Sequence, residues 1–571
     1  MNTNTPQTPN TQPDEPTTRF VGHAVLVGLL TLVSRFTGLA RDAVLAAALG
    51  LSSVADAFFI GFLVPNLFRR LFGEGALAAA FIPQYTELLE RDPQLARRFA
   101  SATIAGLTVL LLAITLVVEL GLWWLAARIG GGEAGGKTAL ALMYTRIMLP
   151  YMPLVCLVAM VGGVLQVHKR FGPPAAAPVL LNLVMIAAVL IPTAMLRDTA
   201  NPQRAATWLA FGVLLGGVGQ LVWQAVVLVR VSGLAGSFAG VGPSMKKMLV
   251  MMGPMVLGLA VFQINALLDS LIAFFLAPGE VLGESIEWFG QSVAMPLQRG
   301  DVAALQWSQR LYQFPLGVFG IAIATAIFPA LSAAAAKWAK ARDDSDSADP
   351  AQIQAEQDAF ARTLRQGLRL TLFIGLPASV GLMLTRVPLA RVVYERGAFE
   401  SEDSLRVATI LAGYAAAVWA YSMTHTITRA FYALQDAKTP LKVGVGMVGL
   451  NLTLNLTLIW PLGAAGLAWA TAISAAGQVG LLLLLIRRRV SRPIDAEVLR
   501  SWAKTVLATL LMGAALWPVT LLIDLPSLSL AGAGGVLAGM VILGMTLVLV
   551  VAWLGGAEEL SWLRRRAGKG S

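Results

Sequence analysis

Fourteen apolar runs follow one another along the chain, separated by short polar segments. A helix needs about 20 apolar residues to cross the hydrocarbon core of a bilayer, and the runs have about that length. They occupy residues 24–50, 55–72, 98–127, 138–165, 174–196, 205–230, 248–277, 302–335, 364–386, 405–432, 440–460, 464–486, 502–524 and 528–554. The pattern predicts an all-α integral membrane protein with about 14 transmembrane helices. An even number of crossings places both termini on one side.

Composition supports this class. Of the 571 residues, 57% are hydrophobic and 13% are charged, whereas soluble domains carry roughly 25% charged residues. A soluble enzyme, a disordered chain and a fibrous protein are therefore excluded. The single cysteine, Cys156, excludes a disulfide framework, and the three histidines lie too far apart for a metal site. The net charge of +11 indicates basic cytoplasmic loops rather than a nucleic-acid partner.

Lys and Arg occur in alternate loops, which gives an orientation. The basic loops carry Arg91, Arg97 and Arg98; Lys169 and Arg170; Lys246 and Lys247; Lys337, Lys340 and Arg342; Lys438 and Lys442; and Arg487, Arg488, Arg489 and Arg492. By the positive-inside rule these loops and both termini are cytoplasmic. Segment 280–300 is then an outward-facing loop or an interfacial helix. The acidic stretch 342–358 is predicted to be a flexible cytoplasmic linker.

An internal repeat divides the helices into two groups. Leu165-Gln166 precedes Asn182-Leu183 by the same spacing that separates Leu434-Gln435 from Asn451-Leu452. Such parallel repeats are typical of transporters with a site between two lobes. The expected division is a disordered cytoplasmic tail (1–20), an N-lobe with helices 1–6 (21–235), a C-lobe with helices 7–12 (236–492), and helices 13–14 with a basic tail (493–571).

Ionisable side chains inside the predicted spans are candidate functional residues, because they are costly at the bilayer centre. The candidates are Ser34, Arg35, Arg41 and Asp42 in helix 1, Asp56, Asn66, Arg69, Arg70 and Glu74 in helix 2, and Arg310 in helix 8. Arginines in excess of nearby acids predict a positive, hydrated cavity that suits phosphate and carboxylate oxygens. Alternatives remain: Arg70 can extend to the interface, Asp42 can neutralise an arginine, and Asp56 can cap helix 2.

Two further patterns have weaker functional interpretations. Residues 131–138 match the phosphate-binding pattern G-x-x-x-x-G-K-T, but they join two membrane helices instead of a strand and a helix. We therefore expect Lys137 to be dispensable. Asn182, Asn451 and Asn455 are typical of hydrogen bonds between membrane helices. Asn451 and Asn455 can alternatively form a cation site with Asp269 and Thr471.

Several motifs resemble those of the MurJ (MviN) family of lipid II flippases. They are Ser34-Arg35-Phe36-Thr37-Gly38-Leu39-Ala40-Arg41-Asp42, Asp56-Ala57-Phe58-Phe59, residues 65–76, Gln309-Arg310-Leu311-Tyr312-Gln313-Phe314-Pro315, and residues 433–440. The resemblance implies two six-helix lobes in a V, with two extra C-terminal helices forming a lipid-tail groove. It also implies Arg35, Arg41, Arg69 and Arg310 as cavity residues, with Asp56 and Glu74 as acids. Relatives carry a sodium site matching Asp269, Asn451, Asn455 and Thr471, although Asn455 replaces a better-binding acid here.

Together these observations predict a function. The expected activity is the flipping of lipid II, the undecaprenyl-pyrophosphate-linked disaccharide-pentapeptide precursor of peptidoglycan, across the bacterial inner membrane. Arginines with Asn66 and Ser34 would bind the head group, while Asp42, Asp56, Glu74 and Arg70 would serve in charge pairing or gating. Alternating access driven by membrane potential or an ion gradient would serve cell-wall biogenesis and cell shape. No cofactor other than possible Na⁺ is expected, and the partners are membrane lipids and cell-wall synthesis proteins around a monomer. The alternatives are another oligosaccharide-lipid flippase or a drug/cation antiporter. An enzyme is disfavoured, because no carboxylate cluster suits acid–base chemistry.

Overall fold

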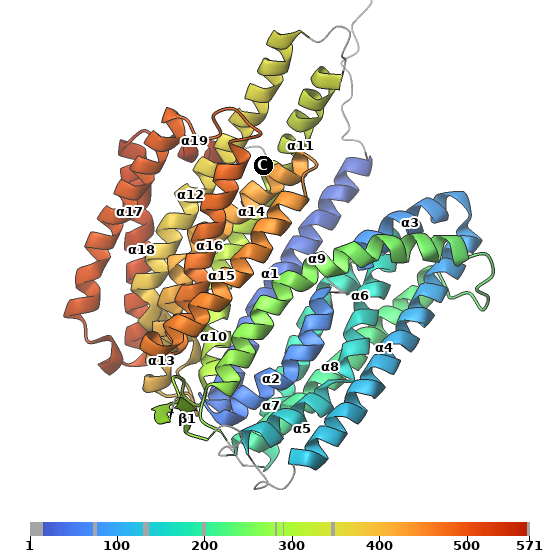
Figure 1. The fold of residues 1–571 in the computed structure, drawn as a ribbon, viewed down its shortest axis with the longest axis vertical. Helices are drawn as coiled ribbons and strands as arrows, with labels where there is room; N and C mark the ends of the chain where they lie inside the picture. Colours follow the sequence, from blue (N-terminus) through green and yellow to red (C-terminus); the bar gives the residue numbers. More distant parts are fainter. Residues whose placement is uncertain are drawn as a thin grey trace, which may run out of the picture.

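The computed structural model describes residues 15–71, 77–129, 136–196, 201–279, 283–288, 290–343 and 349–567. Eight helices precede the middle of the chain: α1 (Glu15–Leu49), α2 (Ser53–Phe68), α3 (Leu77–Arg91), α4 (Pro93–Ile129), α5 (Lys137–Met148), α6 (Tyr151–Val167), α7 (Gly172–Leu196) and α8 (Pro202–Val231). They pack mainly against one another and form the first bundle (Figure 1).

A long helix, α9 (Gly242–Phe275), links this bundle to a second one. It is followed by the strands β1 (Ser285–Trp288) and β2 (Gln291–Ala294), α10 (Asp301–Pro315), a π-helical turn (Leu316–Gly320), α11 (Ile321–Asp343), α12 (Pro350–Tyr394), α13 (Ser401–Ala416), α14 (Val418–Ala433), α15 (Lys438–Leu462), α16 (Ala464–Ile486), α17 (Ala496–Leu522), a 3₁₀ turn (Leu525–Ser527), α18 (Leu530–Leu554) and α19 (Glu558–Ala567). Helices α10–α18 form the second bundle, in which α17 and α18 pack on α12.

The all-α membrane architecture is confirmed. Eleven helices in the described part of the chain are long and apolar enough to span a membrane. The three other predicted spans lie in α1, α2 and α9, so the total of fourteen stays a prediction. Runs 138–165 and 405–432 each form two helices, with the break at Leu149-Pro150 in the first and at Ala417 in the second.

Three local expectations differ from the structure. Segment 280–300 contains an antiparallel hairpin, β1–β2, in place of an interfacial helix. The predicted linker 342–358 is largely helical, because α11 continues to Asp343 and α12 begins at Pro350, with Asp349 as its N-cap. Likewise, α1 begins at Glu15, inside the predicted tail 1–20. The polar composition of these segments suggested loops, whereas Asp349 caps α12 and backbone pairing joins β1 to β2.

The repeat is visible in the loops that precede α7 and α15. Lys169 and Gln435 both adopt a left-handed conformation, with φ of 59°, and the next helices begin three residues later in both halves. Aligning these two residues also aligns Pro174 with Pro440. In the same alignment, Asn182 and Asn451 do not coincide but lie about one helical turn apart. The sequence spacing therefore found the related helices but matched the asparagines incorrectly.

The two bundles meet at one end of the molecule. We call the end that carries β1, β2 and residues 50–52 the hairpin end, and the end that carries α19 the tail end (Figure 1). One apolar core includes Phe58 of the first bundle together with Trp307 and Phe399 of the second. A separate core around Phe360 and Phe431 belongs to the second bundle alone. The helices therefore share a core at the hairpin end and pack as separate bundles elsewhere.

Candidate functional site

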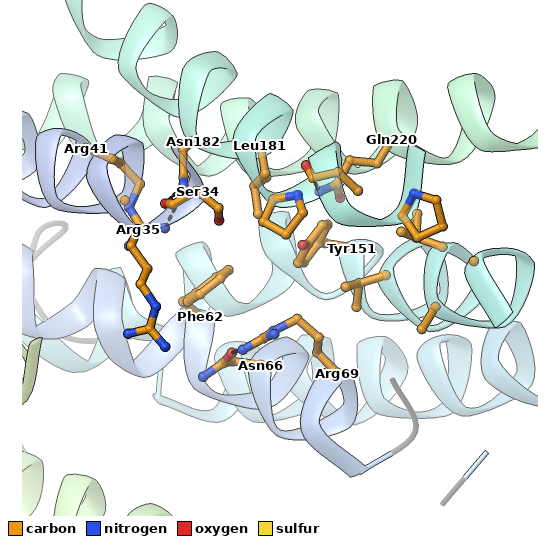
Figure 2. A pocket seen from close by; sticks show the side chains of 18 of the residues that line it. Ser34, Arg35, Arg41, Phe62, Asn66, Arg69, Tyr151, Leu181, Asn182 and Gln220 are labelled. Carbon is orange, nitrogen blue, oxygen red and sulfur yellow. Dashed lines mark hydrogen bonds between the residues drawn. The ribbon is translucent and has the colours of Figure 1, made fainter. Parts of the chain in front are cut away.

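A cavity of about 510 Å³ lies mainly in the first bundle, with α10 contributing its remaining wall. Among the residues lining it are seven predicted site residues: Ser34, Arg35, Arg41, Asp42, Asn66, Arg69 and Arg310. Among the described residues of the lining, the charged ones are four arginines and one aspartate, so this part of the wall is positive. Figure 2 shows Arg41 beside Asn182 and Arg69 beside Asn66, with Phe62 and Tyr151 drawn between the two pairs.

Asp42 joins arginines from both bundles. Its Oδ1 accepts hydrogen bonds from Nε and Nη2 of Arg41 at 3.0 and 2.6 Å, and its Oδ2 lies 3.5 Å from Nε of Arg310. Arg41 also donates from Nη1 to Oδ1 of Asn182 at 3.0 Å. One carboxylate thus faces two guanidinium groups. Asp42 can therefore neutralise part of their charge while Arg41 and Arg310 still line the cavity. Excess positive charge remains for an anionic ligand.

Arg69 and Arg35 occupy different parts of the wall. Arg69 donates to Oδ1 of Asn66 from Nε and Nη2, at 3.1 and 3.0 Å. The guanidinium of Arg35 lies against Gly317, where any Cβ would collide with it. Gly317 belongs to the π-helical turn after α10, and such turns often occur at functional sites. Arg35 therefore reaches from the first bundle to the second.

Two other predicted charges, Arg70 and Asp56, do not line the cavity. Arg70 donates to Oε1 of Gln263 in α9 at 3.3 Å. Glu74 lies outside the described residues. Asp56 is completely buried at the hairpin end, where its carboxylate accepts N–H groups of Gly300 and Ala303 at 2.7 and 3.0 Å. Helix α2 is capped by Ser52 instead, so Asp56 caps α10 of the opposite bundle.

Lys137 supplies a second contact between chain halves at the hairpin end. The ammonium group donates to the backbone oxygens of Phe274 and Ala277 at 2.5 and 3.2 Å, and it lies 4.4 Å from the centre of the Phe274 ring. These carbonyls belong to the C-terminus of α9, where a cation is favoured. Residues 131–135 of the phosphate-binding pattern lie outside the described residues. The Lys137 side chain is only 4% exposed. Our expectation that Lys137 is dispensable did not anticipate these contacts with the end of α9.

Backbone contacts add to the junction, by which we mean the contacts between the two bundles at the hairpin end. Ala398 donates to the carbonyl of Ala47 at 2.7 Å, and the N–H of Leu51 donates to Asp403 at 3.3 Å. Gly300 has a φ of +88°, and a Cβ there would lie 2.6 Å from the backbone of Leu51. A side chain at this position would therefore push the two bundles apart.

The candidate cation residues come together as α9, α15 and α16 meet. Nδ2 of Asn455 donates to Asp269 at 2.5 Å and to Asn451 at 3.1 Å, and Asn451 donates to Thr471 at 3.3 Å. Oδ1 of Asn455 has no partner in the described part of the chain. Hard cations take oxygen ligands, so these residues fit a cation if the Asn455 amide rotates to turn its oxygen inward. Asp269, Asn451 and Asn455 are all buried.

Sequence reasoning missed part of the cavity wall. Tyr151, Gln166, Gln220 and Gln224 line it, together with Asn182, which the sequence suggested only as a helix contact. Gln220 and Gln224 are four residues apart in the apolar helix α8, so they share a face. That spacing was the available signal, but neutral amides carry a weaker signal than arginines.

Comparison with known proteins identifies the family of the chain. The model of the lipid II flippase MurJ family matches residues 45–525. A probable lipid II flippase MurJ of Vibrio cholerae serotype O1 is 32% identical over 554 residues, which cover 95% of this chain and 97% of that protein. The chain belongs to the lipid II flippase MurJ family. The resemblance inferred from the motifs is confirmed, and the protein is a transporter rather than an enzyme.

Solved structures share the fold. A lipid II flippase MurJ in an inward closed conformation superposes with a TM-score of 0.70 at 23% identity, covering 93% of this chain and 98% of that one. An inward-facing multidrug resistance MATE family transporter of the MOP superfamily gives a TM-score of 0.59 at 15% identity, over 82% and 98% of the two chains. The chain therefore shares its fold with both of these transporters.

Proposed function

We propose that this protein flips lipid II from the inner to the outer leaflet of the bacterial cytoplasmic membrane. The observation that carries the proposal is the arginine-lined cavity, in which Asp42 joins Arg41 of one bundle to Arg310 of the other. The head group of lipid II carries a pyrophosphate and peptide carboxylates. Guanidinium groups suit these oxygens, because their planar donors can bind two oxygens at once.

The proposed mechanism is alternating access. The hairpin end, where Asp56 and Lys137 cap helices across the junction, faces the outside and is closed here. The cavity takes up the head group from the cytoplasmic side and then opens at the hairpin end as the bundles rock. An anion moving outward gains about 2.3 kcal/mol per charge per 100 mV of inside-negative potential. Membrane potential can therefore drive the cycle without ATP.

The lipid tail stays in the bilayer during this movement. Helices α17 and α18 expose leucines along their outer faces, including Leu507, Leu510 and Leu543, and they provide the proposed groove for the tail. Because the cavity lies within a single chain, we propose that the protein works as a monomer, alongside membrane lipids and cell-wall synthesis proteins.

Sodium is a proposed coupling ion. It would bind Asp269, Asn451, Asn455 and Thr471 after rotation of the Asn455 amide, since their oxygens then converge. A dependence of flipping on a sodium gradient that Asp269→Ala removes would support this site. Equal flipping with sodium or choline outside would leave membrane potential as the driving force.

A drug/cation antiporter is a weaker alternative despite the shared superfamily. A pocket for organic cations needs unpaired acids and aromatic faces. Here Asp42, the one acidic residue among the described residues of the lining, is already in contact with Arg41 and Arg310.

Purified protein in vesicles tests the function. Fluorescent lipid II placed in one leaflet should become accessible from the other only with the unmodified protein, and Arg41→Ala should abolish this exchange. Equal exchange by empty vesicles and by both proteins would overturn the proposal. Depletion in cells should likewise trap lipid II in the inner leaflet.

Orientation has a separate test. With Cys156→Ala as background, an impermeant thiol reagent added to intact cells should label Glu287→Cys in β1 but not Arg488→Cys after α16. Both positions are exposed. The opposite labelling would invert the proposed topology.

A further inference from the structure

Gln224 has an unusual environment for a cavity residue. Its side chain is 1% exposed, and neither Oε1 nor Nε2 has a hydrogen-bond partner in the described part of the chain. One helical turn earlier in α8, Gln220 donates from Nε2 to the carbonyl of Ala177 at 2.6 Å, while its Oε1 has no such partner. Both residues line the cavity. Buried amides normally find partners, because leaving them without any is costly.

Asn182 shows what a structural amide looks like in the same wall. Its Oδ1 accepts from Arg41, and its Nδ2 lies 3.2 Å from Oγ1 of Thr37 and 3.3 Å from the carbonyl of Ser34. Asn182 therefore fixes α7 against α1, with both its oxygen and its nitrogen engaged in hydrogen bonds. The amide of Gln224 fixes no helix through hydrogen bonds, although it is equally buried.

The packing around Gln224 holds its amide in place. A Cβ on Gly162 of α6 would lie 3.4 Å from Oε1 of Gln224 and 3.3 Å from Cβ of Pro174. The amide is therefore enclosed by two neighbouring helices, and glycine at position 162 leaves room beside it. Gln166, one turn later on α6, is exposed and also lines the cavity. All three glutamines, from α6 and α8, therefore line the same cavity.

We propose that Gln224, with Gln220 and Gln166, forms a subsite for an uncharged amide group of the transported molecule. A glutamine amide offers one acceptor and two donor hydrogens, so it matches another amide, which also carries a donor and an acceptor. Arginines would instead select anionic oxygens. This inference rests on the proposed function and divides the cavity: arginines bind the charged part of the head group, and glutamines bind neutral amides of its sugars or peptide.

Two sources of amide are present in such a head group, the N-acetyl groups of the sugars and the peptide bonds of the stem. Three probes separate them: the polyprenyl pyrophosphate alone, the same lipid carrying the N-acetylated disaccharide without peptide, and complete lipid II. Gln224→Met keeps the length of the side chain and removes the amide. The matched control is Gln203→Met, at an exposed position near the start of the same helix.

Equilibrium titration of the purified full chain should show weaker binding by Gln224→Met. We expect a loss of roughly tenfold for the disaccharide lipid and for lipid II, which corresponds to one or two hydrogen bonds, and no change for the pyrophosphate lipid. A loss confined to complete lipid II supports the subsite and assigns it to peptide amides. An equal loss for all three probes, or no loss for any, overturns it.

Stability gives a second, independent measurement. Without ligand, Gln224→Met should melt at a higher temperature than the unmodified protein, because it removes buried polar atoms that have no partners. Gln203→Met should change neither binding nor melting. A lower melting temperature for Gln224→Met would identify a structural residue and overturn the proposal. If the unmodified protein bound none of the probes, the proposed function would fail as well, whereas a failure of the subsite alone leaves normal binding.

Discussion

The hairpin end and the cavity both contain buried polar side chains, but they use them differently. At the hairpin end, Asp56 accepts two backbone N–H groups and Lys137 donates to two backbone carbonyls. Each charge meets the helix terminus of opposite polarity, the N-terminus of α10 and the C-terminus of α9. In the cavity, the one carboxylate of the described lining contacts two of the four arginines, Arg41 and Arg310, and Gln224 has no partner among the described residues.

This difference separates residues that close the protein from residues that bind. Contacts between a side chain and a helix terminus satisfy both groups without a ligand, so they stabilise one conformation. Cavity side chains with unused donors gain partners only when a ligand arrives. Buried charge alone therefore does not identify a binding site. The better indicator is whether the donors and acceptors of the buried side chain already have partners within the protein.

The largest expected effect tests the cavity side of the comparison. Arg310→Ala should reduce lipid II flipping in vesicles to less than roughly a tenth, because a charge-assisted bond contributes about 1.5–3 kcal/mol. Arg310→Lys should restore part of the activity, since it keeps the charge but not the planar donors. If Arg310 only paired with Asp42, Arg310→Ala with Asp42→Asn would recover full activity. That recovery would contradict a binding role.

The next effect tests the junction. Asp56→Ala removes the N-terminal cap of α10 and two bonds to a charged group, each worth about 1.5–3 kcal/mol. A cysteine replacing Ala159, which lines the cavity, should then react faster with an impermeant thiol reagent added outside cells. We expect a rate increase of at least roughly tenfold in the Cys156→Ala background. Glu87→Ala, an exposed acid on α3, is the control, and equal rates for both variants would contradict a closing role for Asp56.

Lys137 should have a smaller effect on the same reporter. Lys137→Met removes the two bonds to the carbonyls at the end of α9 but keeps an apolar side chain over Phe274. Labelling should therefore rise several-fold, but less than with Asp56→Ala, because the contact with the ring is retained. Lys247→Met provides the matched control, because Lys247 is exposed and lies 3.9 Å from Glu87. Unchanged labelling with Lys137→Met would restore the expectation that this lysine is dispensable.

The sequence predicted the cavity better than the junction. Arg35, Arg41, Arg69 and Arg310 were identifiable because charge inside an apolar run is costly, and all four line one cavity. Asp56 looked like a cap of its own helix. Its true partners, Gly300 and Ala303, are distant in sequence, and backbone donors leave no mark in the sequence.

Helices were predictable for a similar reason, since apolar runs of the right length report the bilayer directly. The hairpin β1–β2 was not, because its eight residues contain too few alternating positions to separate a strand from a loop. Gln224 was missed because one neutral amide in a membrane helix is typical of helix contacts. Only the absence of partners in the described structure distinguished it from Asn182.

The smallest expected effect lies at the tail end, outside the membrane spans, and shows a third use of buried charge. Glu559 of α19 is 2% exposed, and its Oε1 accepts bonds from Arg369 of α12 and Ser501 of α17, both at 2.7 Å. Burial alone would raise the pKa of Glu559, but the bonds from Ser501 and Arg369 outweigh it and lower the pKa from its usual value of 4.5. This carboxylate therefore stabilises the docked α19 fully above pH 4.5, and the stabilisation is lost as the pH falls through the lower pKa of the folded state.

Hydrogen exchange of α19 should be slow at pH 7 and, after correction for the intrinsic rate, should increase below pH 4, by roughly tenfold for the loss of one charge-assisted bond. Glu559→Gln should exchange faster at pH 7 and lose the pH dependence, whereas Glu497→Gln, at an exposed position 3.9 Å from Arg369, should behave like the unmodified protein. A pH dependence that survives in Glu559→Gln would show that another group controls the docking of α19.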